Sequence, residues 1–331
     1  MKRTAAGAVT PVNPTTYIVQ ATNLTSREIY LYPDGKQESV LRGIYLEIKR
    51  GECWGVIGKE PFETELLMEI IGNVRPYGSG RCVLVERGMM RKKRRILPHV
   101  FYISGWETVL TNMNTLEYLM YVTSHFDYPA AQRQAAILEM LLDTNLYHLT
   151  LVPIKYLSNA EKAVICLAAA SLSNALLVIF SVAELTFNDR LNQGIRALGN
   201  NITSRGGALL IGSGDCDMVQ AACSHAAFLI DGKFTQRGTI DDMLMYLDKR
   251  TFILTADKPE QLAAALRQLW PGFALRVFDN QVHVYDHTPK PVTETELLAL
   301  LLKAGQRIEA IQTSHRTLKN AYQEVLAGHD L

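Results

Sequence analysis

The stretch GVIGKEPFETELL, residues 55–67, decides how this chain is interpreted. Residues 52–57 form an apolar run typical of a buried strand, and residues 65–71 have the apolar spacing typical of a helix. A loop between a strand and a helix binds phosphate when it follows the pattern G-x-x-x-x-G-K-[ST]. Laid on this chain from Gly58, the pattern finds its first glycine and none of its other fixed residues. The sequence therefore keeps the place of a phosphate-binding loop without its usual chemistry.

Three positions of the pattern carry different residues. Glu63 replaces the second glycine, Thr64 the lysine and Glu65 the Ser/Thr. Pro61 removes one backbone N–H from the same segment. The carboxylates of Glu60, Glu63 and Glu65 are expected near the place of the polyphosphate, where like charges at ~4 Å repel by on the order of 1 kcal/mol in water. The substitutions predict a loop that no longer binds nucleotide.

The composition suits a soluble globular protein with one large and one small domain. The chain has 331 residues, of which 48% are hydrophobic, and a net charge of +1, which gives no reason to expect nucleic acid as a partner. Its five cysteines, without a C-x-x-C pair, indicate reduced thiols and no metal site. Residues 1–14 are polar and are expected to form a flexible arm, and the longest apolar runs are too short to span a bilayer.

Strands and helices are expected to alternate along most of the chain. Residues 17–23 and 41–48 partly alternate apolar and polar side chains, as half-buried antiparallel strands do. Continuous apolar runs at residues 176–180, 209–211 and 227–230 are typical of central parallel strands. Further strands are expected at residues 81–85 and 100–103, and helices over about residues 114–147, over residues 158–172 and from residue 217. This order predicts a mostly parallel α/β sheet.

The composition changes near residue 250. Strands are expected at residues 251–254, 274–278, 281–285 and 308–312, and helices at residues 259–269, 294–304 and 318–326. A βαββαβ order of this kind is typical of a small ferredoxin-like domain.

Over about residues 15–250, the order of elements resembles the ATP-binding subunit of an ABC transporter. Three segments carry the resemblance: LRGIYLEIKRGE at residues 41–52, LSNAE at residues 157–161, and the turn at residues 231–233 with the Gly-Thr pair that follows at residues 238–239. The tail resembles the small C-terminal domain of many exporter-type members. The resemblance implies a P-loop NTPase-type α/β domain with a helical subdomain at about residues 105–172, and a small α+β ferredoxin-like domain at residues 251–331.

In this family a buried strand ends in an Asp that binds Mg²⁺ and a Glu that activates water. Read without a gap, the run at residues 176–180 places Ser181 and Val182 there, and neither can bind Mg²⁺ strongly or act as a base. The same register places Asn188 at the aspartate of the family's D-loop. A register shifted by two residues keeps Glu184 as a candidate catalytic base and still lacks the metal-binding Asp. The first register is preferred because it preserves the strand and the D-loop together.

Two further catalytic positions of the family are also changed. The glutamine that senses Mg²⁺ corresponds to Gly105, and the switch histidine corresponds to Gly214. Four separate motifs thus lack their usual side chains. The resemblance then implies no metal and no nucleotide bound by the chain's own site.

The signature segment at residues 157–161 is the best preserved. In the family it reads L-S-G-G-Q, opens a helix and contacts the γ-phosphate bound to the opposite subunit. Ser158 is kept and Asn159 is small, so these two residues and Gly58 are the candidate nucleotide-binding residues. Two interpretations stay open: Ser158 is only an N-cap in a capping box with Glu161, or it retains contact with ATP shared with a partner subunit.

These expectations describe a catalytically degenerate, nucleotide-binding-domain-like subunit of a heteromeric ABC transporter. Its expected partners are an intact ABC ATPase subunit and a transmembrane permease at the cytoplasmic face of a membrane. The permease is expected near residues 104–118, where Trp106, Leu110 and Met113 supply apolar surface. Two alternatives remain open: an active ABC ATPase with an unorthodox site, and a non-transport scaffold or regulator with the same fold.

Overall fold

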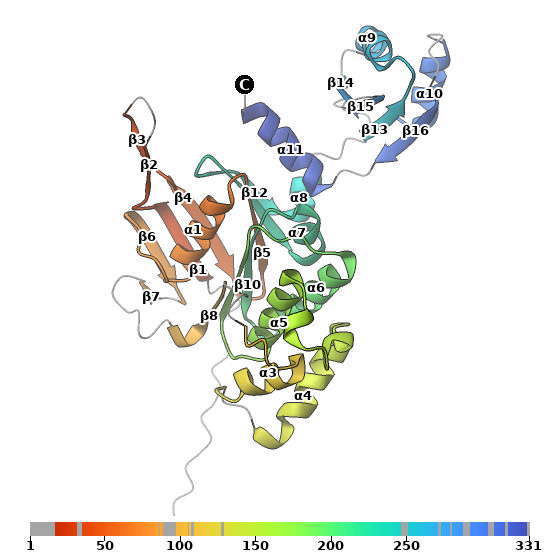
Figure 1. Ribbon diagram of the computed structural model, residues 1–331. Coiled ribbons are helices and arrows are strands. Elements are labelled where there is room, and N and C mark those ends of the chain that lie inside the picture. Colours follow the sequence, from red (N-terminus) through yellow and green to blue (C-terminus); the bar gives the residue numbers. More distant parts are fainter. Residues whose placement is uncertain are drawn as a thin grey trace, which may run out of the picture. The chain divides into compact units, whose positions relative to one another are not determined.

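The computed structural model describes residues 17–31, 35–85, 87–88, 97–104, 106, 109–126, 129–245, 251–270, 273–278, 280–286, 292–303, 308–314 and 317–329. The chain divides into two compact units, Met1–Ile240 and Asp241–Leu331 (Figure 1). The expected arm at residues 1–14 and Gly105 lie outside the described residues.

The first unit contains a four-stranded antiparallel sheet with the strand order β4-β1-β6-β7. Its strands are β1 Tyr17–Thr25, β4 Ile44–Lys49, β6 Ser79–Leu84 and β7 Arg87–Gly88. Buried and exposed residues alternate strictly along β4, which confirms the half-buried antiparallel strand predicted there. A separate small hairpin pairs β2 Ile29–Leu31 with β3 Gln37–Ser39.

A six-stranded sheet with the order β12-β11-β5-β10-β9-β8 forms the centre of this unit. Its strands are β5 Cys53–Gly58, β8 Val100–Ile103, β9 Leu177–Val182, β10 Ala208–Ser213, β11 His225–Ile230 and β12 Lys233–Thr239. All pair in parallel except β12, which returns antiparallel to β11 after a turn. Every residue of β9 and β10 is buried, so the apolar runs did mark central parallel strands.

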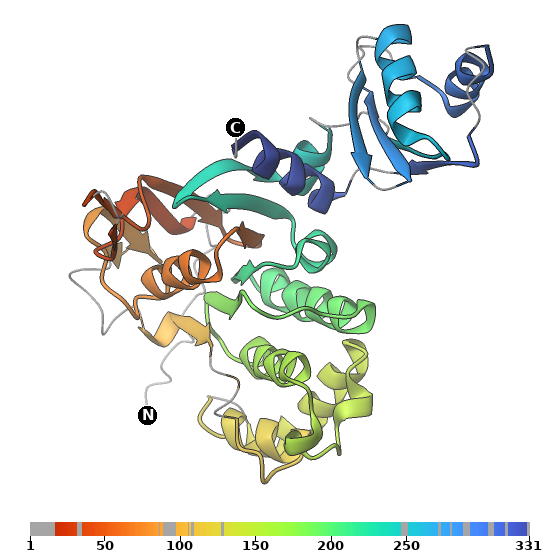
Figure 2. The same cartoon turned by 45° about the horizontal axis from the view of Figure 1, so that its top comes forward.

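Helices cover both faces of the six-stranded sheet (Figures 1 and 2). Helix α1 Pro61–Ile71 packs its apolar residues into one core with residues of both sheets. Helices α5 Asn159–Ser171, α6 Asp189–Ser204 and α7 Cys216–Ala222 contact strands of the central sheet. The sequence predicts no element at α6; its apolar side chains alternate with polar ones at the helical period instead of forming a continuous run.

A group of helices packs against α5 through α3 (Figure 2). It contains α3 Thr115–Thr123 and α4 Ala130–Asp143, followed by the 3-10 turns η4 Tyr147–Leu149 and η5 Ile154–Tyr156. A further 3-10 turn, η2 Leu97–His99, precedes β8, and α8 Ile240–Met245 follows β12. None of the described helices combines the length and the apolar character that a bilayer crossing requires.

The second unit has a four-stranded antiparallel sheet with the order β14-β15-β13-β16. Its elements are β13 Thr251–Thr255, α9 Pro259–Leu269, β14 Phe273–Phe278, β15 Gln281–Asp286, α10 Glu294–Lys303, β16 Ala310–Ser314 and α11 Leu318–His329. A core of its own, with Phe252 and Leu254 of β13 against Leu262 and Leu266 of α9, holds this unit together. The predicted order of strands and helices is observed.

Candidate functional site

Helix α1 begins earlier than the sequence predicts, at Pro61 instead of residue 65. Only Lys59 and Glu60 separate it from β5, which ends at Gly58. Proline is well suited to the first helical position because its fixed φ is helical and its missing N–H is not needed there. Glu60 is the N-cap residue, with an extended backbone. A turn of helix therefore stands where the sequence pattern places a phosphate-binding loop.

Two backbone donors of this segment bond within the first turn of the helix. The N–H groups of Glu63 and Thr64 donate to the carbonyl of Glu60, at 3.1 and 3.3 Å. Pro61 has no N–H. In a phosphate-binding loop, such N–H groups point at the ligand instead.

Thr64, at the lysine position of the pattern, is 1% exposed. A Cβ added at Gly58 would lie 1.8 Å from the Thr64 Oγ1, and one added at Gly212 would lie 3.0 Å from its Cγ2. The threonine side chain thus fills the space between the ends of β5 and β10. The two glycines are needed there because this packing leaves no room for a side chain at either position.

Glu63 is buried, so the expectation that its carboxylate lies at the place of a polyphosphate is wrong. Its carboxylate accepts the N–H of Gly232 at 3.0 Å and the hydroxyl of Tyr30 at 3.3 Å. Burial raises the pKa of Glu63, and these two hydrogen bonds lower it in part. The turn that presents Gly232 has positive φ at Asp231 and Gly232, which is typical of a two-residue hairpin turn.

Carboxylates gather beside α1 near the end of β9. Partial burial raises the pKa of Glu65, and the charges of Glu184 and Glu69 raise it further. Tyr102 of β8 lies in the same region: burial raises its pKa, a hydrogen bond with Ser181 lowers it, and the charge of Glu69 raises it. The structure therefore brings Glu65, Glu184 and Ser181 together. Burial is the larger cause of the raised Glu65 pKa, and repulsion between the carboxylates adds to it.

Ser181 and Val182 are the last two residues of β9, and both are buried. They pair in parallel register with Gly212 and Ser213 of β10. Glu184 lies two residues beyond the strand and is exposed. In the described part of the chain, no group of three or more His, Cys, Asp or Glu side chains is placed to hold a metal ion.

The segments that follow β9 and β10 are tied to each other. The N–H of Gly214 donates to the carbonyl of Ala183 at 3.2 Å, and the carboxylate of Asp215 accepts the N–H of Phe187 at 3.0 Å. Asn188 caps α6 by accepting the N–H of Leu191 at 2.9 Å. At the positions expected for the D-loop aspartate and the switch histidine, Asn188 thus caps a helix and Gly214 bonds to the segment after β9.

Ser158 forms the capping box predicted for the start of α5. Its hydroxyl accepts the N–H of Glu161 at 3.3 Å, and the Glu161 carboxylate accepts the N–H and the hydroxyl of Ser158, both at 2.8 Å. Asn159 is the first residue of the helix and is exposed. Nearby, burial and the charge of Arg190 lower the pKa of His148, whereas the Glu161 carboxylate raises it.

The sequence did not single out Tyr30, Gly232 or Asp215 as parts of this region. Glu63 and Gly232 are 169 residues apart, and no local pattern announces a bond over that separation. Asp215 has a detectable signal, because an Asp three residues before a helical N–H is a common N-cap, and it does accept the N–H of Met218 at 3.0 Å.

No known family model matches this sequence. A putative ABC transporter ATP-binding protein of Nostoc sp. is 23% identical over 232 residues, which is 68% of this chain and 84% of that protein. The methionine import ATP-binding protein MetN of Nocardia farcinica is 24% identical over 222 residues, 64% of this chain and 66% of that protein.

Solved structures agree with this likeness. CbiO1 of Clostridium perfringens, part of the ABC transporter complex CbiONQ, superposes with a TM-score of 0.56 at 18% identity and covers 77% of this chain and 96% of its own. The ATP-binding cassette MJ0796, as a dimer in a post-hydrolysis state with ADP and phosphate, has a TM-score of 0.54 at 15% identity and covers 67% of this chain and 98% of its own.

The central parallel sheet, the helices on both its faces and the flanking antiparallel sheet define an ATP-binding cassette fold. The chain is thus similar in fold to the ATP-binding cassettes of ABC transporters, and similar in sequence, at 23% and 24% identity, to the two ATP-binding proteins named above.

Proposed function

We propose that this chain is a catalytically degenerate, nucleotide-binding-domain-like subunit of a heteromeric ABC transporter. The observation that carries the proposal is the first turn of α1. There the Glu63 and Thr64 N–H groups donate to the Glu60 carbonyl, and the Thr64 side chain fills the space beside Gly58. A polyphosphate needs N–H donors that point at it and a lysine at the position of Thr64. Here the Glu63 and Thr64 N–H groups bond within the helix, and Thr64 carries no charge.

The charges beside α1 support the same conclusion. Partial burial raises the pKa of Glu65, and the charges of Glu184 and Glu69 raise it further. A nucleoside triphosphate placed there would add more negative charge. The end of β9 has no Asp that could hold a compensating Mg²⁺. These residues do not fit Mg²⁺-ATP, so we assign no catalytic step to Glu184 and no cofactor to the chain's own site.

The signature segment is the part that can still serve a nucleotide. Helix α5 begins at Asn159 on an exposed surface, and the N-terminus of a helix favours anions. We assign Ser158 and Asn159 to the γ-phosphate of an ATP held by an intact ABC ATPase partner. Glu161 makes this contact weaker than a neutral residue would, because its charge opposes the phosphate.

This role places the protein on the cytoplasmic face of a membrane, where the partner's ATP drives a permease. The permease would contact the apolar surface near residues 104–118, at which Leu110 is 43% exposed. The proposal assigns no nucleic-acid partner to the chain. The nucleotide-related role is assigned to residues 15–250, and residues 251–331 are assigned to a separate ferredoxin-like domain, which the observed βαββαβ order supports.

The test is the ATPase activity of the reconstituted complex with Ser158→Arg. The long arginine side chain removes the hydroxyl and occupies the space through which the phosphate must approach, so the activity of the complex is expected to fall by about tenfold or more. The matched control is Thr293→Arg, because Thr293 and Glu296 form the same capping box in the second unit. Equal activities of the two variants in assembled complexes would contradict a role of Ser158 at the partner's site.

A further inference from the structure

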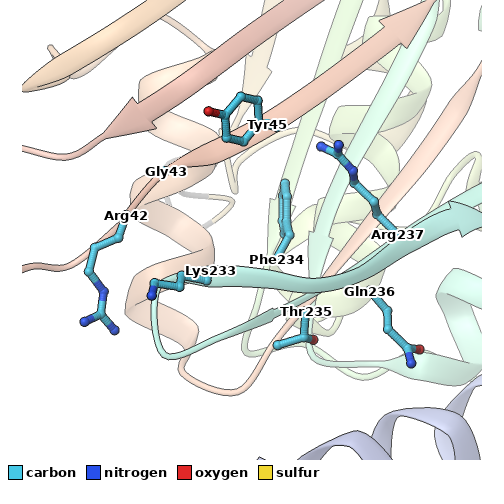
Figure 3. A pocket seen from close by; sticks show the side chains of 8 residues that line it. All are labelled: Arg42, Gly43, Tyr45, Lys233, Phe234, Thr235, Gln236 and Arg237. Atoms are coloured by element: carbon cyan, nitrogen blue, oxygen red, sulfur yellow. The ribbon is translucent and has the colours of Figure 1, made fainter.

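A cleft separates two strand edges in the first unit. Strand β4 is the edge of the four-stranded sheet, and β12 is the edge of the six-stranded sheet. The two strands are joined where they start, because the N–H of Arg42 donates to the carbonyl of Gly232 at 2.8 Å. Beyond this bond they leave a cleft of about 400 Å³ between them, which is within the size range of small-molecule sites (Figure 3).

An irregularity in β12 shapes this cleft. Phe228 of β11 pairs with Gln236 and Leu229 pairs with Phe234, so Thr235 is an extra residue on β12. Such a β-bulge changes which way the following side chains point. Figure 3 shows the result: Phe234 and Arg237 both point toward β4, whereas Thr235 and Gln236 point the other way. Regular alternation would have placed Phe234 and Arg237 on opposite faces.

The charge of the cleft is positive. Arg42, Lys233 and Arg237 line it, and no carboxylate does. Glu38 lies beside it, pairs with Arg42 and Lys36, and is in the field of Lys233. Within the described residues, Arg237 has no carboxylate partner. This arrangement leaves Lys233 and Arg237 able to bind an anion.

Two aromatic rings form the apolar walls. Tyr45 lies on the exposed face of β4 and is 46% exposed, and Phe234 faces it from β12 (Figure 3). The guanidinium of Arg42 points away from Tyr45, toward Glu38 and the carbonyl of Asp231. The cleft thus has cations at Lys233 and Arg237 and aromatic surface between the strands. Rings of this kind bind planar apolar groups.

We propose that the cleft between β4 and β12 binds a small phosphoester anion that carries a planar ring, with Lys233 and Arg237 on the phosphate and Tyr45 and Phe234 on the ring. The site is separate from the phosphate-loop position. Gly232 lies between the two: its N–H donates to Glu63 of α1, and its carbonyl accepts the N–H of Arg42 at the cleft.

The test uses the full chain and isothermal titration without Mg²⁺, with AMP, inorganic phosphate and adenosine as probes. AMP is expected to bind saturably and at least about tenfold more tightly than phosphate or adenosine, because only AMP engages both cations and rings. Lys233→Gln with Arg237→Gln should weaken AMP binding by about tenfold or more, and Phe234→Leu should weaken AMP binding without changing phosphate binding. Arg81→Gln, an exposed cation on β6, is the control and should bind AMP as the parent does.

Absence of saturable AMP binding up to ~10 mM would overturn the proposal. It would also be overturned if the double variant, folded as judged by its thermal unfolding, bound AMP as tightly as the parent. Phosphate that binds as tightly as AMP would overturn the assignment of the rings.

Discussion

At the scale of single residues, Glu63 shows how a substitution acquires a new role. A carboxylate in place of a loop glycine is expected to face the ligand, yet this one is buried and ties α1 to the β11–β12 turn through Gly232. The cause is the early start of α1. Once residues 61–64 are helical, the side chain of residue 63 is directed into the protein. The sequence revealed that the residue had changed, whereas only the fold shows where it points.

Substitutions of Glu63 should separate its hydrogen bonds from its charge. Glu63→Ala leaves the buried N–H of Gly232 without a partner, so the free energy of unfolding is expected to fall by about 1–3 kcal/mol. Glu63→Gln keeps an oxygen for that N–H and is expected to change stability at neutral pH by less than about 1 kcal/mol. Urea unfolding of the purified variants measures both effects.

The pH dependence provides a second check on Glu63. Its pKa in the folded protein is raised above the ordinary 4.5, so the folded state holds this proton more tightly than the unfolded state. The resulting stability is fully present below about pH 4.5 and is lost as the pH rises through the folded-state pKa. Because Glu63→Gln lacks this titration, its stability relative to the parent should increase with pH over that window. A constant difference across the window would contradict the assignment.

At the scale of elements, the helix starts decide what the two nucleotide-related segments can do. Helix α1 starts early at Pro61, so its first N–H groups bond to the Glu60 carbonyl. Helix α5 starts at the predicted place and keeps an exposed N-terminus with a capping box. The capping box was predictable because its two residues are three positions apart. The start of α1 was missed because the interpretation followed the apolar spacing of residues 65–71 and gave no weight to Pro61 as a helix start.

Ser158 variants distinguish the capping role from a role toward nucleotide. Ser158→Ala should lower the stability of the chain by about 1 kcal/mol, whereas Ser158→Gly should cost only a few tenths, since glycine is tolerated at the N-cap. Both remove the same hydroxyl. If that hydroxyl contacts the partner's ATP, the two variants should reduce the ATPase activity of the complex equally despite their different stabilities. Activity that follows stability instead would indicate a capping role alone.

At the scale of the whole molecule, the chain has two units with separate buried cores. The alternation of strands and helices was predictable because central strands are continuous apolar runs, and each unit buries its own cluster of hydrophobic side chains. Contacts between distant segments were not, since neither the bond between Glu63 and Gly232 nor the cleft between β4 and β12 has a local pattern. Both depend on the turn at Asp231 and Gly232, which the sequence marks only as a turn.

The central claim is that the phosphate-loop position binds no nucleotide, and equilibrium binding of Mg²⁺-ATP to the purified full chain tests it most directly. The chain used should carry Lys233→Gln and Arg237→Gln, so that the cleft between β4 and β12 does not contribute. The matched comparison is a chain with a restored loop pattern, which carries the additional substitutions Pro61→Gly, Glu63→Gly, Thr64→Lys and Glu65→Ser. We predict no saturable Mg²⁺-dependent binding tighter than about 1 mM; a micromolar dissociation constant that requires Mg²⁺ would contradict the account.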